Sequence, residues 1–114
     1  MDQVWYDPDK DPNDTSWDIY GKNISTGKVF PIDTNPSYHS YLVNIGTNGK
    51  ILLWRKNSVG KRFQDSSLWA TELSTGNTIL ISKGAENGAI YGDLVVYSKN
   101  KNIYGYYLDE TSFR

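Results

Sequence analysis

A ten-residue stretch that occurs three times in this chain decides its fold. The first copy reads Asp18-Ile-Tyr-Gly-Lys-Asn-Ile-Ser-Thr-Gly27, and the second, 49 residues later, reads Ser67-Leu-Trp-Ala-Thr-Glu-Leu-Ser-Thr-Gly76. A third copy, a further 35 residues along, reads Asn102-Ile-Tyr-Gly-Tyr-Tyr-Leu-Asp-Glu-Thr111 and lacks the final Ser-Thr-Gly. Each copy opens with the apolar and aromatic run typical of a strand, and Ser-Thr-Gly suits a tight reversal. The stretch therefore predicts a repeated strand and turn.

Short apolar runs flank each copy and complete a four-stranded unit. Because short turns join these runs, each unit is expected to be an antiparallel meander. The units divide one 114-residue domain into three segments, 1–35, 36–84 and 85–114. The expected strands cover residues 4–6, 19–24, 29–32, 41–45, 51–54, 68–73, 78–81, 89–91, 94–97 and 103–108, with the start of one more at Ser112 to Arg114.

The composition agrees with a single all-β domain. Hydrophobic residues make up 38% of the chain and aromatic residues 14%, which is enough for one core, and no stretch has helical periodicity. A net charge of −1 offers no basic field for nucleic acid, and no apolar run approaches the ~18 residues of a membrane helix. With no Cys, disulfide frameworks and thiolate nucleophiles are excluded. We expect no nucleic-acid partner and no membrane insertion.

Four-stranded units at this spacing suit the blades of a β-propeller. The motif from Asp18 to Ile32 resembles the blade repeat of TolB-like propellers and of propeller modules in bacterial cell-surface proteins. The resemblance covers nearly the whole chain and implies about two and a half to three blades. It also implies a platform that binds a ligand or protein, with chemistry seldom carried by the blades, and a secreted, periplasmic or cell-surface location.

The long connections are expected at one end of the strands. Turns in a meander alternate between two ends, and here the short turns share one end while segments 7–16, 33–40, 55–67 and 82–88 share the other. Loops on a rigid scaffold tend to carry function. We therefore expect a ligand-binding surface at this long-loop end, with the candidate residues Trp17, Asn35, Tyr38, His39, Lys61, Arg62, Gln64 and Asp65.

The first of these long connections is acidic, because residues 1–18 contain six Asp and one Lys. Four of the carboxylates have the alternating spacing by which a short loop turns several oxygens toward a hard cation such as Ca²⁺. Pro12, however, stands where an EF-hand loop needs Gly. A solvated acidic loop and a Ca²⁺ site both remain open; the ligands of that site would be Asp7, Asp9, Asp11 and Asp14.

No catalytic constellation is visible in the sequence. The single histidine, His39, has no second histidine for a metal site, and no nucleophile and base share a suitable spacing. We expect a non-enzymatic binding or scaffold segment whose partner is a protein or a carbohydrate, with no cofactor apart from the Ca²⁺ candidate. Two alternatives stay open: an accessory propeller of a hydrolase, and a self-assembling lectin-like propeller.

Three units are too few to close a ring, because propellers have roughly 4 to 8 blades. An open arc exposes the apolar faces and strand edges of its terminal units to water. We therefore expect the chain to associate with further copies of itself, or with the remaining blades of a longer parent chain.

Overall fold

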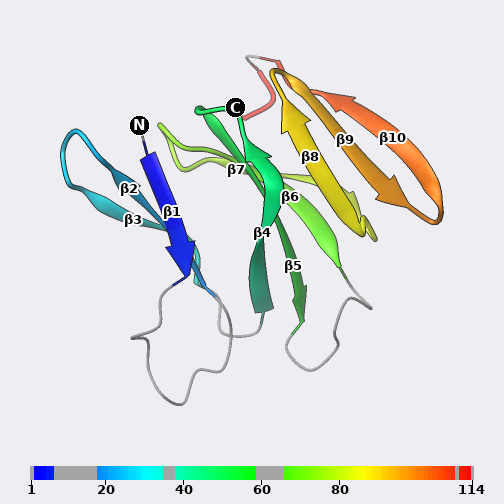
Figure 1. Cartoon of the computed structure of the whole chain (residues 1–114), viewed down its shortest axis with the longest axis horizontal. Coiled ribbons are helices and arrows are strands. Elements are labelled where there is room, and N and C mark those ends of the chain that lie inside the picture. Colours follow the sequence, from blue (N-terminus) through cyan, green and yellow to red (C-terminus); the bar gives the residue numbers. More distant parts are fainter. Residues whose placement is uncertain (1, 7–17, 35–37, 59–65, 110, 114) are drawn as a thin grey trace.

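The described part of the chain contains ten β-strands, and consecutive strands pair antiparallel except at two points, where the chain passes from one group of strands to the next (Figure 1). The structure, a computed structural model, describes residues 2–6, 18–34, 38–58, 66–109 and 111–113. These residues contain no helix, so the all-β prediction is confirmed, and nothing in them could cross a membrane as a helix. The strands are β1 (Asp2–Tyr6), β2 (Ile19–Asn23), β3 (Val29–Asp33), β4 (Tyr38–Thr47), β5 (Ile51–Ser58), β6 (Ser67–Glu72), β7 (Thr78–Lys83), β8 (Asn87–Tyr91), β9 (Leu94–Lys99) and β10 (Asn102–Tyr107).

The strands form two hydrogen-bonded sheets. One has the order β1-β2-β3, and the other has the order β10-β9-β8-β4-β5-β6-β7. All pairings join consecutive strands antiparallel except that of β4 with β8, which is parallel and has one register pair, Ile45 with Ala89. The larger sheet therefore consists of two meanders, β4 to β7 and β8 to β10, joined along their first strands. We call β1–β3 the first sheet, β4–β7 the middle sheet and β8–β10 the last sheet.

The two Ser-Thr-Gly segments form the turns that the repeat predicts. Gly27 and Gly76 have φ angles of 75° and 80°, in the left-handed region where only glycine is unstrained. Their amides donate to Asn23 O and Glu72 O, both at 2.8 Å. These turns lie at the same end of the strands as the β4–β5 and β8–β9 turns (Figure 1).

The middle sheet is covered on both faces and forms the centre of the core. On one face, Leu52 and Trp54 cluster with Ile19 of the first sheet. On the other, Leu53 and Leu68 belong to a cluster that includes Ile90 and Val95 of the last sheet. Successive residues of a strand point to opposite faces, so adjacent apolar residues such as Leu52 and Leu53 serve different neighbours. The continuous apolar run at 51–54 follows from this double burial.

The end of the chain departs from the sequence prediction. The prediction that a strand starts at Ser112 to Arg114 is wrong for the described residues, because residues 111–113 form a turn. Asp109 Oδ1 accepts hydrogen bonds from Thr111 N at 2.8 Å and Thr111 Oγ1 at 2.6 Å. Phe113, only 7% exposed, packs into the core, and its carbonyl oxygen accepts from Asn77 Nδ2 at 3.1 Å. Burial of this aromatic ring replaces pairing along β10.

Candidate functional site

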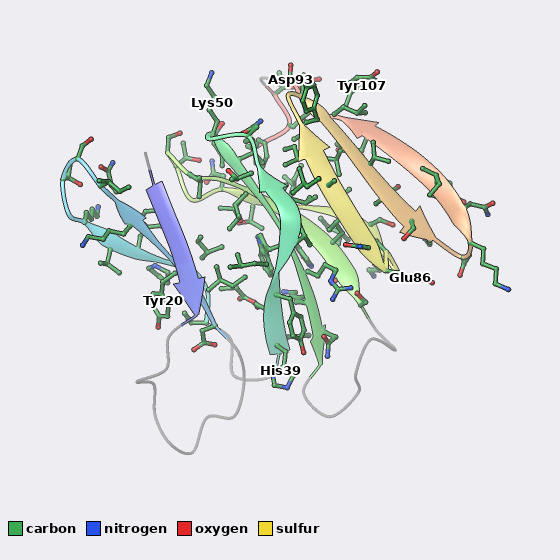
Figure 2. All side chains as sticks on the ribbon, in the orientation of Figure 1. Tyr20, His39, Lys50, Glu86, Asp93 and Tyr107 are labelled. Atoms are coloured by element: carbon green, nitrogen blue, oxygen red, sulfur yellow. The ribbon has the colours of Figure 1, made fainter. Side chains whose placement is uncertain are left out.

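The predicted long-loop end lies opposite the short turns. Figure 2 shows His39 at this end and Lys50 and Asp93 at the other. Of the candidate ligand-binding residues, Tyr38 and His39 are described. Both lie in β4, so the prediction that the connection 33–40 includes them is wrong. The other candidates lie outside the described residues and stay predictions: Trp17, Asn35, Lys61, Arg62, Gln64 and Asp65.

Tyr38 and His39 point to opposite faces of the middle sheet, because side chains alternate along a strand. The His39 ring lies 6.1 Å from that of Tyr41, and the Arg55 guanidinium carbon lies 5.7 Å from the Tyr41 ring centre. Arg55 Nη1 also donates to the carbonyl oxygen of Glu86. His39 therefore shares its face with Tyr41 and Arg55, whereas Tyr38 faces the first sheet.

Tyr38 belongs to a group of aromatic rings around one ammonium, which we call the aromatic–lysine cluster: Tyr38, Trp54, Lys56 and Trp69. The Lys56 Nζ lies 4.3 Å from the ring centre of Trp69, 4.7 Å from that of Tyr38 and 5.8 Å from that of Trp54. Each separation is within the range of a cation–π attraction, up to about 6 Å. The three strands β4, β5 and β6 bring these side chains together on the face toward the first sheet.

Hydrogen bonds fix the two tryptophan rings of the cluster. Trp54 Nε1 donates to Thr71 Oγ1 at 2.9 Å, and Trp69 Nε1 donates to Ser67 Oγ at 2.8 Å. The two rings stack at 6.0 Å with an interplanar angle of 18°. Trp54 is buried, whereas Trp69 is half-buried. The cluster therefore has a rigid interior and a partly accessible outer ring.

Such a cluster can bind a ligand that has both a flat apolar face and hydroxyl or carbonyl oxygens. The half-buried rings of Tyr38 and Trp69 offer stacking surface, and the Lys56 ammonium donates hydrogen bonds. Trp54, Lys56 and Trp69 are not among the residues predicted from the sequence to bind a ligand. Their signal is the period-two spacing of Trp54 with Lys56 on β5, opposite Trp69 on β6.

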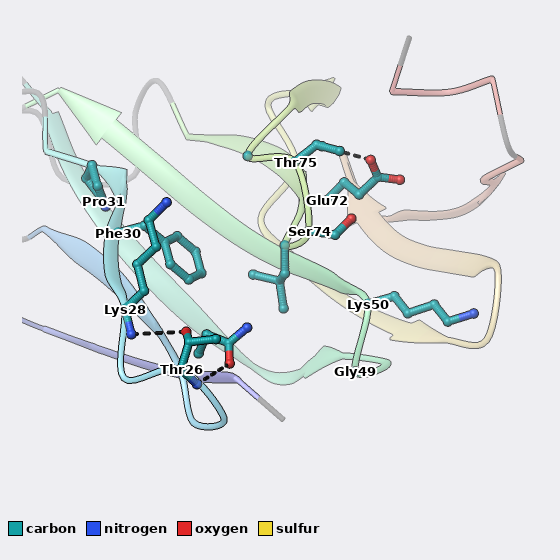
Figure 3. A pocket seen from close by; sticks show the side chains of 12 residues that line it. Thr26, Lys28, Phe30, Pro31, Gly49, Lys50, Glu72, Ser74 and Thr75 are labelled. Atoms are coloured by element: carbon teal, nitrogen blue, oxygen red, sulfur yellow. Dashed lines mark hydrogen bonds between the residues drawn. The ribbon is translucent and has the colours of Figure 1, made fainter.

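An open groove of about 660 Å³ lies at the short-turn end (Figure 3). The equivalent turns 25–27 and 74–76 contribute to opposite sides of it, with Phe30 and Lys50. Thr75 Oγ1 donates to Glu72 Oε1 at 2.8 Å, and the Thr26 amide donates to Asn23 Oδ1 at 3.1 Å. None of the residues predicted to bind a ligand lies in this groove, although the repeated Ser-Thr-Gly segments point to its two turns.

No group of three or more His, Cys, Asp or Glu side chains in the described part of the chain is arranged to hold a metal ion. The Ca²⁺ prediction rests on Asp7, Asp9, Asp11 and Asp14, which all lie outside the described residues. The described geometry therefore does not test the Ca²⁺ site, which stays a prediction.

Comparisons with known proteins give one partial similarity. No family model matches the chain, and no solved structure matches it. A stretch of 66 residues, 58% of the chain, is 35% identical to part of botulinum neurotoxin type F from Clostridium botulinum. The chain spans 5% of the length of that toxin, so the similarity establishes no family for the chain.

Proposed function

We propose that this chain is a non-enzymatic binding or scaffold segment made of β-propeller blades, of the TolB-like kind that its repeat resembles. The blades would be residues 1–35, 36–84 and 85–114. The stacking of three successive meanders supports this proposal, since the middle sheet is covered on both faces. The parallel pairing of β4 with β8 supports it as well, because the first strands of neighbouring blades run in the same direction along the central channel of a propeller.

We further propose that the segment recognises a protein or a carbohydrate through its long-loop end. The observation that carries this proposal is the aromatic–lysine cluster, which lies in the described part of that end. It favours a carbohydrate, because the C–H face of a sugar ring stacks on an aromatic ring while its hydroxyls accept from an ammonium. The chain would be secreted, periplasmic or at the cell surface, as the resemblance implies.

A glycan array followed by titration of tryptophan fluorescence tests the proposal. We expect a glycan ligand whose binding changes the fluorescence, because two of the four tryptophans lie in the cluster. Lys56→Met removes the ammonium while keeping an unbranched apolar chain, and Trp69→Ala removes the partly exposed ring. Each should weaken binding by about tenfold or more, the equivalent of 1.4 kcal/mol.

Lys50→Met is the matched control, because Lys50 is an exposed lysine at the opposite end of the strands. It should bind the glycan as the unaltered chain does. Glycan binding that Lys56→Met and Trp69→Ala leave unchanged would place recognition elsewhere, and a chain that binds no glycan would leave a protein as the proposed partner.

A self-assembling lectin-like propeller is the second candidate. It combines the aromatic–lysine cluster with the exposed apolar side chains of the last sheet, which include Ile103 and Tyr107. A glycan-binding protein that is also a multimer would favour it. The accessory propeller of a hydrolase would instead require a catalytic domain in the parent gene, and sequencing the flanking gene decides that case.

A further inference from the structure

We infer that the outer face of the last sheet binds the first sheet of a second copy of this chain. This outer face consists of Tyr91, Val96, Ile103 and Tyr107, whose exposed fractions range from 40% to 88%. Figure 2 shows Tyr107 on one flank of the molecule and Tyr20, in the first sheet, on the other. The proposed contact is independent of the ligand site described above.

The internal repeat identifies Ile103 as an interface residue. Ile19, Leu68 and Ile103 occupy the same position in the three copies of the repeat. Ile19 and Leu68 are both 0% exposed, because each is covered by the next sheet along the chain. Ile103 is 72% exposed. At this repeat position, the last sheet therefore exposes its side chain to solvent, whereas the two preceding sheets bury theirs against a neighbouring sheet.

The two interfaces inside the chain have the same polarity, which indicates the face that would cover Ile103. Ile19 of the first sheet meets the face of the middle sheet that carries Trp54 and Trp69. Leu68 of the middle sheet meets the face of the last sheet that carries Val95. In both interfaces, the aliphatic repeat residue of one sheet packs on one particular face of the following sheet. That face is the one opposite to the following sheet's own aliphatic repeat residue.

The first sheet presents the required opposite face at the other flank of the chain. Tyr20 is equivalent to Trp69 in the repeat and points away from Ile19 by strand alternation. Its cross-strand partner is Pro31, and Val29 pairs with Lys22 on the same face. Val29 is 51% exposed. A second copy would therefore continue the existing stack, with its first sheet on the last sheet of the copy before it.

This contact is head-to-tail, because two different faces meet. Such contacts form a closed ring when the rotation between copies allows it and a longer array when it does not. Exposed apolar surface of this kind marks interaction sites in soluble proteins. The occupant that fits the repeat is another sheet of the same repeat, and a second copy supplies one.

Sedimentation velocity of the 114-residue protein, from micromolar to submillimolar concentration, tests the inference. We expect the mass to rise above 13.0 kDa as concentration increases. Ile103→Arg and Val29→Glu each place a charge in the contact and should each lower the association constant by at least about tenfold. Leu80→Arg alters a partly exposed apolar residue of β7, outside both faces, and should associate as the unaltered chain does.

Mixing Ile103→Arg with Val29→Glu gives the most specific readout, because each variant keeps one intact face. A head-to-tail contact requires the mixture to form a complex of two chains, and nothing larger, although each variant alone is a monomer. Formation of that complex also shows that both variants fold. A 13.0 kDa monomer at every concentration, unchanged association of Ile103→Arg, or a mixture that stays monomeric would each overturn the inference.

Discussion

Replacing Gly46 of β4 with Ala should lower the free energy of unfolding, whereas replacing Gly105 of β10 with Ala should raise it. The pair of variants therefore tests the packing around β4. Gly46 is buried beside the register shift in the β4–β5 pairing. A Cβ at Gly46 would lie 2.8 Å from Val43 O and 3.0 Å from Leu53 O. Both neighbours are backbone atoms, so Gly46→Ala must move a strand. At Gly105 the nearest atom, Leu94 Cδ1, would lie 3.5 Å away in ordinary contact.

Replacing Gly by Ala at a compatible position stabilises a protein by about 0.4–1 kcal/mol, since the unfolded chain loses conformational freedom. This term is common to both variants. Neither glycine has a positive φ, so Gly105→Ala should show the gain alone. Overpacking costs about 1–3 kcal/mol, so the free energy of unfolding of Gly46→Ala should lie lower than that of Gly105→Ala by this amount.

Equilibrium unfolding in urea measures the difference, with midpoint and slope fitted separately so that a change in the unfolded state is recognised. Equal midpoints for the two variants would refute the reasoning, because they would show that β4 yields to the added methyl group without cost. A stabilised Gly46→Ala would refute it as well.

Three further outcomes are expected. Leu68→Ala should lower the free energy of unfolding by about 2–5 kcal/mol in the same urea assay, because Leu68 is fully buried between two sheets. Hydrogen bonds from Thr111 hold the pKa of exposed Asp109 below its ordinary value of 3.8. Folding therefore favours the charged form of Asp109. The difference in free energy of unfolding between the unaltered chain and Asp109→Asn should be constant near neutral pH and should decrease below about pH 4. Thermal melts across this pH range measure that difference. If the acidic loop binds Ca²⁺, millimolar Ca²⁺ should raise the melting temperature, and Asp9→Ala should abolish that rise; calorimetry without a binding signal would leave the solvated loop.

The strands and turns of this protein were determined by its sequence, because both depend on neighbouring residues. Runs such as 78–81 and 94–97 carry β-branched and aliphatic side chains that favour extended backbone, and Gly76 supplies the positive φ of the turn between β6 and β7. The repeat also placed equivalent residues in equivalent strands, since each copy encodes the same local unit.

Only the tertiary structure decided which face each strand buries and what lies against it. Phe113 lies five residues beyond Leu108, yet its position depends on a hydrophobic cluster and on Asn77, 36 residues away. Lys56 lies among aromatic rings from three strands. Its period-two spacing with Trp54 indicates a shared face of β5, but the rings that surround it come from strand pairings that the local sequence does not specify. Ile103 occupies the same repeat position as Ile19 and Leu68 but has a different exposure. Burial depends on the presence of a neighbouring sheet, a long-range property that strand periodicity does not encode.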